Sequence, residues 1–435
     1  MATSLAQTAS AIRDIRLAPE GERRIAWARR HMPVVRALAE EVAADGVLRG
    51  VHVVTCAHVT TETGVLVEAL LRAGAHATVC ASNPLSTQDD LAAYLVAAHD
   101  ASVFAIRGEA AAQTAHHQDR ALDALATHSG IQIVLDDGAD LVASLHGERR
   151  DLLSRVAGAT EETTTGIVRL RSLHMQGKLG IPVITVNDTP TKHFFDNRYG
   201  TGQNTIDGIL RATNVLLAGR RVVVCGYGWC GRGIASRARG MGAHVAVCEV
   251  QPVPALEALM DGYAVMPILE AATWGDIFVT ATGNAGVLRP EHFVLMRDGA
   301  ILANSGHFDI EIDVLGLHAL AGAPRPGREH VEEFQLSDGR CIYLLAQGRL
   351  VGQAAAEASP AAVMDMSFAN QLMSVAYLAR RARENPLAPG LYPVPPEIDE
   401  RIASMKLAAL GVQIDTLTAD QRTYMASWSV GTGAA

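Results

Sequence analysis

The chain has 435 residues, of which 49% are hydrophobic, and its formal net charge is −9 at pH 7. This length exceeds what one hydrophobic core usually organises, so we expect about two or three domains. The acidic balance argues against nucleic-acid binding, and no stretch reaches the roughly 18 uncharged apolar residues of a membrane span. The first residues lack the apolar run of a signal peptide, and six scattered cysteines suit reduced thiols, so we expect a cytoplasmic protein.

Strand and helix patterns alternate along the first half of the chain. Apolar runs predict strands at 51–56, 76–81, 103–106, 131–135 and 181–186. Helical periodicity predicts helices at 63–73 and 91–98, and Ser86-Thr-Gln-Asp89 is typical of a capping box that opens the second of them. Such alternation indicates a parallel, doubly wound sheet.

The most specific motif follows a predicted helix at 205–217. Arg221-Val-Val-Val-Cys225 predicts a buried strand that leads into Gly226, Gly228 and Gly231, a G-x-G-x-x-G turn opening a helix at 233–241. These glycines permit a tight turn, close approach of a pyrophosphate and packing of helix on strand. A second strand at 244–248 leads to Glu249, which can accept hydrogen bonds from ribose hydroxyls. No arginine follows Glu249, so the motif predicts NAD rather than NADP.

Further strands at 277–280 and 300–304 complete a second sheet. A helix at 360–383 is expected to pack back on the first domain, and a terminal helix is predicted at 397–410. The expected fold class is α/β, with two doubly wound parallel-sheet (Rossmann-like) domains and a small C-terminal helical segment. The boundaries we expect are 1–190 with 358–390, then 197–352, then 391–435.

Polar clusters follow the strand ends of the first sheet, where open α/β sheets bind ligands. The clusters are His58 to Glu62, Asn83 to Asp90, Asp136-Asp137 and Asn187 to Asp196. Taken singly, each has a structural explanation, because Thr or Asp residues can begin helices and Lys192 with Asp196 can form a surface ion pair. The same holds for Glu161 to Thr165, which can cap a helix. His58 and Glu62 are spaced i, i+4, but no third ligand is evident, so we expect no metal.

Together these blocks resemble the S-adenosyl-L-homocysteine hydrolase (adenosylhomocysteinase) family over about residues 48 to 425. The matching blocks are Ser86 to Asp89, Glu161 to Gly166, Val186 to Asp188, Thr191-Lys192, Phe195 to Asn197, Tyr199-Gly200, Ile206 to Gly208, Arg211 to Thr213, the Gly226 turn and Gly306 to Asp313. The resemblance implies a nucleoside-binding first domain, an NAD-binding second domain and a homo-oligomer, either tetramer or dimer.

The resemblance also implies a reaction. Tightly bound NAD oxidises the ribose 3′-hydroxyl to a ketone, a base removes the C4′ proton, and the group on C5′ leaves. Water then adds, and the ketone is reduced again, so that the cofactor is regenerated in each turnover.

Roles at individual positions follow from the resemblance. Lys192 would accept the 3′-hydroxyl proton, assisted by Asp196, and burial would lower the lysine pKa for this purpose. His58, Asp137 and His307 would handle the protons of the elimination. The expected substrate contacts are Thr60, Glu62, Glu162, Asn197, Phe308, Gln353, Glu357 and Met364. The expected cofactor contacts are Gly226, Gly228, Gly231, Glu249, Thr163, Thr164, Thr165, Thr282 and Asn304.

One segment departs from the family pattern. Where the family has Leu-Val-Asn-Leu-Gly-Cys-Ala-Met-Gly-His-Pro, this chain has Leu350-Val-Gly-Gln-Ala-Ala-Ala-Glu-Ala-Ser-Pro360. Gln353 and Glu357 would make a formerly apolar channel more polar, which favours a more polar ligand because buried polar groups need partners.

We therefore expect a divergent paralogue, similar to the dehydratases of nucleoside-antibiotic (angustmycin-type) pathways. It would remove water at C5′ of an adenine nucleoside and leave a 4′,5′-unsaturated product. Three alternatives stay open. The first is an adenosylhomocysteinase that releases adenosine and homocysteine, and the second is a non-catalytic paralogue that binds NAD. The third, a 2-hydroxy-acid dehydrogenase, does not account for the blocks at 162–165 and 192–197.

Overall fold

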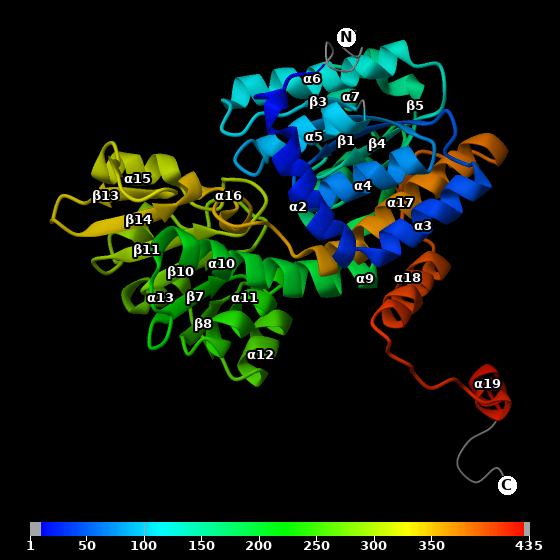
Figure 1. Cartoon of the computed structure of the whole chain (residues 1–435). Helices are drawn as coiled ribbons and strands as arrows, with labels where there is room; N and C mark the ends of the chain where they lie inside the picture. The colour runs from blue at the N-terminus through cyan, green and yellow to red at the C-terminus, as the bar shows by residue number, and fades with distance from the viewer. Residues whose placement is uncertain (1–9, 100, 430–435) are drawn as a thin grey trace.

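The computed structural model describes residues 10–99 and 101–429 and contains two α/β domains (Figure 1). The first domain is built on seven parallel strands in the order β15-β6-β5-β4-β1-β2-β3. Their bounds are β1 His52–Ala57, β2 His76–Ala81, β3 Ser102–Phe104, β4 Gln132–Asp136, β5 Val156–Glu161, β6 Pro182–Thr185 and β15 Gly390–Tyr392.

The second domain has eight strands in the order β12-β13-β14-β11-β10-β7-β8-β9. The six strands β14, β11, β10, β7, β8 and β9 run parallel to one another. At the β14 edge, β13 pairs antiparallel with β14, and β12 pairs antiparallel with β13. The bounds are β7 Arg221–Cys225, β8 His244–Cys248, β9 Ala264–Val265, β10 Ile277–Thr280, β11 Ala300–Asn304, β12 Arg325–Pro326, β13 Val331–Gln335 and β14 Cys341–Leu345.

Helices cover both faces of each sheet, so each sheet lies between two apolar layers. One face of the first sheet carries α2 (Ala18–His31), α3 (Pro33–Asp45), α4 (Thr61–Arg72), α5 (Asp89–His99) and α17 (Ala361–Glu384). The other face carries α6 (Ala111–Thr127), α7 (Asp140–His146) and α8 (Thr164–Met175). Around the second sheet lie α10 (Thr201–Thr213), α11 (Trp229–Gly240), α12 (Pro252–Met260), α13 (Ile268–Trp274), α14 (Pro290–Phe293), α15 (Val314–Ala321) and α16 (Val351–Ala354).

The predicted fold class is confirmed, and every predicted strand forms within one or two residues of its expected ends. The predicted helix at 360–383 is α17, which packs on α3, α4 and β5 of the first domain. The capping box is wrong: α5 begins at Asp89, and the Ser86 hydroxyl bonds to the Asn83 carbonyl and to His58 instead.

The chain crosses between the domains through a tightly packed turn. The short helix α9 (Pro190–Lys192) leads into a π-helical turn at His193–Gly200, which continues directly into α10. This turn packs against α11 at a contact that only glycine permits. A Cβ atom on Gly233 would lie 1.8 Å from the carbonyl oxygen of Arg198, and one on Gly202 would lie 2.6 Å from the Gly233 carbonyl carbon.

The C-terminal segment is helical, as predicted. Helix α18 (Pro396–Ala409) packs on α17 and α3, and Nζ of Lys406 lies 2.8 Å from the buried Asp365 carboxylate. Helix α19 (Ala419–Ala426) has no buried residue and stands apart from the body (Figure 1). Among the described residues, no helix is both long and apolar enough to cross a membrane.

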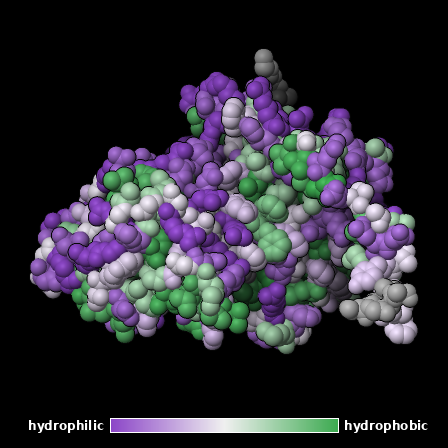
Figure 2. Space-filling model, turned by 90° about the horizontal axis from the view of Figure 1, so that it is seen from below, coloured by the Kyte–Doolittle hydropathy of each residue, from purple (hydrophilic) through white to green (hydrophobic). Residues whose placement is uncertain are grey.

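Apolar side chains reach the surface at several places on the face seen from below, where they are green in Figure 2. Helix α12 and the residues just before it contribute an exposed apolar set on the second domain. Its members, each more than half exposed, are Val250, Val253, Leu256, Leu259 and Met260.

Candidate active site

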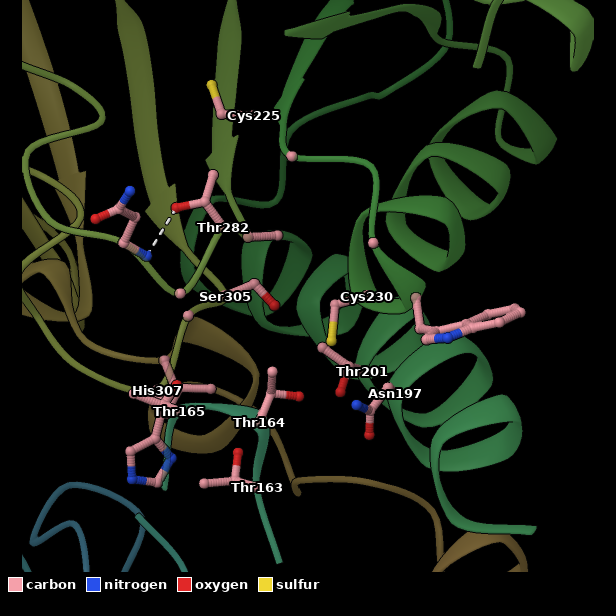
Figure 3. Close-up of a pocket in the computed structure, with 18 of the residues that line it drawn as sticks. Thr163, Thr164, Thr165, Asn197, Thr201, Cys225, Cys230, Thr282, Ser305 and His307 are labelled. Atoms are coloured by element: carbon pink, nitrogen blue, oxygen red, sulfur yellow. Dashed lines mark hydrogen bonds between the residues drawn. The ribbon is translucent and has the colours of Figure 1, made fainter. Parts of the chain in front are cut away.

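A cavity of about 1070 Å³ lies between the two domains and is lined by residues from both. It opens where β1, β4 and β5 of the first sheet and β7, β8 and β10 of the second reach their carboxyl ends, the usual ligand site of such sheets. Figure 3 shows Thr163, Thr164 and Thr165, which follow β5, facing Ser305 and His307, which follow β11.

Lys192 is the centre of a buried polar cluster on this cavity. Its Nζ lies 2.9 Å from Oδ2 of Asp196 and 2.9 Å from Oδ1 of Asn197. It also lies 3.2 Å from Oδ1 of Asn187 and 3.6 Å from Oε1 of Glu162. The π-helical turn brings the side chains at 192, 196 and 197 to the same point, so the ion pair is buried rather than on the surface.

The expected lowering of the Lys192 pKa is wrong for this arrangement. Burial alone would lower this pKa, but the carboxylates of Asp196 and Glu162 outweigh burial and raise it. Lys192 is therefore an ammonium ion between two carboxyl groups. The Oδ1 atom of Asp196 is buried and has no hydrogen-bond partner among the described residues, so it is the open proton acceptor beside the lysine.

Two side chains of α17 each donate a hydrogen bond to Glu162, and the sequence analysis did not predict either of them. Nε2 of Gln371 donates to Oε2 of Glu162 at 2.6 Å, and the Ser367 hydroxyl donates to Oε1. Burial raises the pKa of Glu162 to about 7, although Lys192 acts in the opposite direction. Ser367 and Gln371 are spaced i, i+4 on a helix that is otherwise largely apolar, and that spacing was the available signal.

His58, Asp137 and His307 form a second group on the cavity wall. Nε2 of His58 lies 3.8 Å from Oδ2 of Asp137, and Nδ1 of His307 lies 3.9 Å from Oδ1 of the same carboxyl group. Nδ1 of His58 bonds to the Ser86 hydroxyl at 2.7 Å, which fixes the ring. Burial lowers the pKa of both histidines to about 4, so both imidazoles are neutral near pH 7.

The ligand atoms of this histidine–aspartate group all lie within 4.8 Å of one another, a spacing that could hold a metal ion. The partners of His58 are thus Asp137 and His307 rather than Glu62. The expectation of no metal rested on the lack of a third ligand, but this site offers three candidate ligands.

The dinucleotide turn takes the shape that a pyrophosphate requires. Gly226 has a φ of 100°, and a Cβ atom there would lie 2.8 Å from the Ala281 carbonyl oxygen. Gly228 precedes α11 and faces open space, whereas Gly231 packs against the Gly226 carbonyl rather than lining the cavity. Glu249 lines the cavity at the end of β8, and its Oε2 accepts a hydrogen bond from the Tyr227 amide at 2.7 Å. These residues fit NAD.

Other expected contacts also line the cavity. Thr282 does so while its hydroxyl donates to the buried Glu311 carboxylate at 2.8 Å. The hydroxyl of Thr164 accepts a hydrogen bond from the Asn187 amide at 3.0 Å, which ties the loop at 163–165 to the lysine cluster. The remaining expected residues on the cavity wall are Thr60, Thr163, Thr165, Asn197, Gln353 and Met364.

Besides Gly231, four expected contacts lie elsewhere. The amide of Asn304 is used internally: its Nδ2 donates to the carbonyls of residues 306, 308 and 348, so this side chain braces a loop instead of facing a ligand. The guanidinium carbon of Arg169 lies 5.6 Å from the centroid of the Phe308 ring, and Phe308 does not line the cavity. Glu62 is buried beside Thr61, behind the cavity wall.

Glu357 is the fourth, and it points out of the cavity. Its Oε2 lies 2.7 Å from Nη2 of Arg24, and its side chain is 61% exposed. The expectation that Glu357 makes the substrate channel more polar is therefore wrong, because the ion pair draws the carboxylate to the other side of the segment. Of Gln353 and Glu357, only Gln353 lines the cavity.

Two α/β domains, a glycine turn with an acidic residue after the next strand, and a buried lysine–carboxylate cluster between them define a nucleotide-dependent enzyme. The model of S-adenosyl-L-homocysteine hydrolase matches residues 9–151, and that of the S-adenosyl-L-homocysteine hydrolase NAD binding domain matches residues 197–358. The chain belongs to the S-adenosyl-L-homocysteine hydrolase family, and NAD is its cofactor.

Relatives in three organisms match nearly the whole chain. An adenosylhomocysteinase of Gloeobacter violaceus is 54% identical over 97% of both chains. An adenosylhomocysteinase of Aquifex aeolicus is 54% identical over 97% of this chain and 99% of its own. An S-inosyl-L-homocysteine hydrolase of Methanopyrus kandleri is 50% identical over 97% of this chain and 98% of its own. The similarity thus includes proteins named for two different bases.

Proposed function

We propose that this enzyme cleaves the bond at C5′ of an adenine nucleoside, and that its reaction is the hydrolysis of S-adenosyl-L-homocysteine to adenosine and homocysteine. The relatives that carry this name support the substrate. The observation that carries the proposal is the buried Lys192–Asp196 pair, which shares one cavity with the dinucleotide turn.

The residues of the lysine cluster would activate the sugar. When bound, NAD supplies reversible oxidation at the ribose 3′-carbon. Glu162 accepts a hydrogen bond from the neighbouring hydroxyl and orients the ring. Lys192 and Asp196 take the proton of the 3′-hydroxyl as a pair, with Asp196 Oδ1 as the open acceptor, and Asn197 and Asn187 hold the ammonium group in place.

The histidine–aspartate group would move the protons of the elimination. Neutral imidazoles can accept a proton, and the Asp137 carboxyl group lies between the two rings and stabilises whichever imidazolium forms. Ser86 holds the ring of His58 in one orientation. The group thus supplies both a base for C4′ and an acid for the group that leaves from C5′.

A thiol assay tests this proposal. Purified protein loaded with NAD is incubated with S-adenosyl-L-homocysteine, and free homocysteine is followed with a thiol reagent. Steady release of thiol together with adenosine supports the proposal. No release, while adenosine still produces the 340 nm absorbance of bound NADH, would leave the oxidation chemistry in place and exclude this leaving group.

A second candidate, dehydration of a nucleoside that carries a C5′ hydroxyl, is favoured by one observation. Gln353 stands where the family has an apolar leucine, and its Oε1 is buried without a hydrogen-bond partner among the described residues. A buried acceptor of this kind is stabilised by a ligand hydroxyl. Mass spectrometry of products from adenosine and its 1′-hydroxymethyl analogue decides the matter, because dehydration removes one water and hydrolysis does not.

We also propose the expected boundaries of the nucleoside domain (1–190 and 358–390), the NAD domain (197–352) and the C-terminal segment (391–435), except that strand β15 extends the nucleoside domain to Tyr392. We propose a cytoplasmic homo-oligomer, tetramer or dimer. The exposed apolar set on α12 supports association, since such patches are typical of interfaces. Sedimentation velocity would test the oligomeric state.

A further inference from the structure

Residues 352–359 form a thin wall with a cavity on each side. Gln353, Ala358 and Ser359 line the large cavity between the domains. On the other side, a cavity of about 300 Å³ is lined by Leu17, Arg24, Gln88, Asp89, Asp90, Arg107, Ala356 and Glu357. Gly352 and Ala354 are buried against α10, whereas residues 355–358 are less buried, so the shape of that part depends more on the contacts at its edges.

The backbone of this wall is strained at one position. Ala358 has a φ of 71°, in the left-handed region that side chains with a Cβ atom disfavour. The family motif has glycine at this position. A strained residue persists only where neighbouring contacts impose its conformation.

The Ala358 amide donates to the Gly352 carbonyl at 3.2 Å within the segment, and two arginines of the first domain hold the segment from outside. Arg211 lies farther from Glu357, with 3.9 Å between its Nη1 and Oε1 of Glu357. Nη1 of Arg24 lies 3.0 Å from both carboxylate oxygens of Asp90, which fixes the guanidinium, and its Nη2 bonds Glu357 at 2.7 Å. Nη2 of Arg107 donates to the Ala354 carbonyl at 3.2 Å. At the far end, the amide of Asn204 donates to the Ser359 hydroxyl at 3.1 Å.

We propose that the Arg24–Glu357 ion pair is a positioning device that holds residues 352–359 in the shape that presents Gln353 and Ser359 to the substrate. Glu357 is a positioning residue and acts through the wall, since its own carboxylate does not line the cavity. The part of the proposal that concerns substrate rests on the proposed function.

Hydrogen exchange tests the wall without any substrate. Glu357→Gln in the NAD-loaded protein should raise amide exchange at 352–359 by about fivefold, the upper range for a partly exposed ion pair. Glu40→Gln is the matched control, because Glu40 is equally exposed and pairs with Arg72 on the surface of the first domain. Unchanged exchange in Glu357→Gln relative to the control would overturn the proposal.

Adenosine binding measures the consequence. The dissociation constant of Glu357→Gln should rise about fivefold, and Arg24→Met combined with Glu357→Gln should be no weaker than Arg24→Met alone. For the unaltered protein, about 1 M salt should weaken binding towards the Glu357→Gln value, because the screening length falls to about 3 Å. Because the salt measurement uses the unaltered protein, it does not depend on whether a variant folds.

The two proposals fail differently. If the unaltered protein does not bind adenosine but Glu357→Gln still loosens the wall, the proposed function is wrong and the positioning device stands. If adenosine binds equally to both proteins and at both salt concentrations, Glu357 positions nothing that the substrate contacts.

Discussion

The two sides of the cavity are built in different ways. On the lysine side, Lys192 contacts four residues that come from three segments, and α17 donates two further hydrogen bonds to Glu162. On the opposite side, the wall at 352–359 is strained at Ala358, and its less buried part is held from the first domain by Arg24 and Arg107. The lysine side carries the residues of the family motifs described above, whereas the wall departs from them at several positions.

The largest effect should come from removing the lysine. Lys192→Ala takes away the ammonium group that pairs with Asp196 and Glu162, and cofactor reduction by adenosine should fall by at least about 10³-fold. Absorbance at 340 nm measures this directly. Lys178→Ala, at an exposed lysine, should behave as the unaltered protein. Normal reduction of the cofactor in Lys192→Ala would show that the lysine side of the cavity does not carry the oxidation step.

A smaller loss is expected from the histidine–aspartate group. His58→Asn should slow complete turnover by about 10²-fold, because the elimination loses its base or acid, while adenosine still reduces the bound cofactor at nearly the normal rate. Stopped-flow absorbance separates the two steps. His116→Asn, at an exposed histidine, is the control. Equal loss of both steps would contradict a separate role for this group.

The pH dependence should be several-fold and should come from the lysine side. Because burial raises the pKa of Glu162 to about 7, its carboxyl group is protonated below that pH and ionised above it. Only the ionised form accepts hydrogen bonds at both oxygens, so adenosine affinity should rise through about pH 7. Titration calorimetry of Glu162→Gln should give a flat profile. His58 has a pKa of about 4 and stays neutral over this range.

The smallest effect should be a change in preference at the wall. Gln353→Leu restores the apolar residue of the family motif and removes the unpartnered buried oxygen. It should shift the ratio of activities on S-adenosyl-L-homocysteine and on a C5′-hydroxyl nucleoside towards the thioether by about three- to tenfold, the usual value of one hydrogen bond. Competition between the two substrates measures this ratio. An unchanged ratio would mean that Gln353 does not distinguish the leaving groups.

The sequence predicted those parts of the fold that have a strong local signal. The valine run before Gly226 and the glycine spacing defined the second domain, since β-branched strands and glycine turns are specified by a few consecutive residues. Strand β5, Val-Ala-Gly-Ala-Thr-Glu, was missed because small residues give no strand pattern, although they are what α17 needs to pack closely: a Cβ atom on Gly158 would lie 2.9 Å from Leu378.

The site was predicted where one motif carried several of its members. The spacing of Lys192, Asp196 and Asn197 was visible, but a π-helical turn at that point was not. The direction of the Lys192 pKa shift and the outward turn of Glu357 could not be read from the sequence. The Lys192 pKa shift depends on the local Asp196 together with Glu162 from a distant segment, and the position of Glu357 depends on Arg24 from another distant segment.

The contact of the π-helical turn with α11 has a consequence for motion. Because Gly233 meets the Arg198 carbonyl with no side chain between them, the backbone that carries Asp196 and Asn197 is locked to the helix that begins at the dinucleotide turn. Any opening of the cavity must therefore hinge elsewhere. A side chain at position 233 would push this turn away from α11 and shift Asp196 and Asn197 relative to the dinucleotide turn.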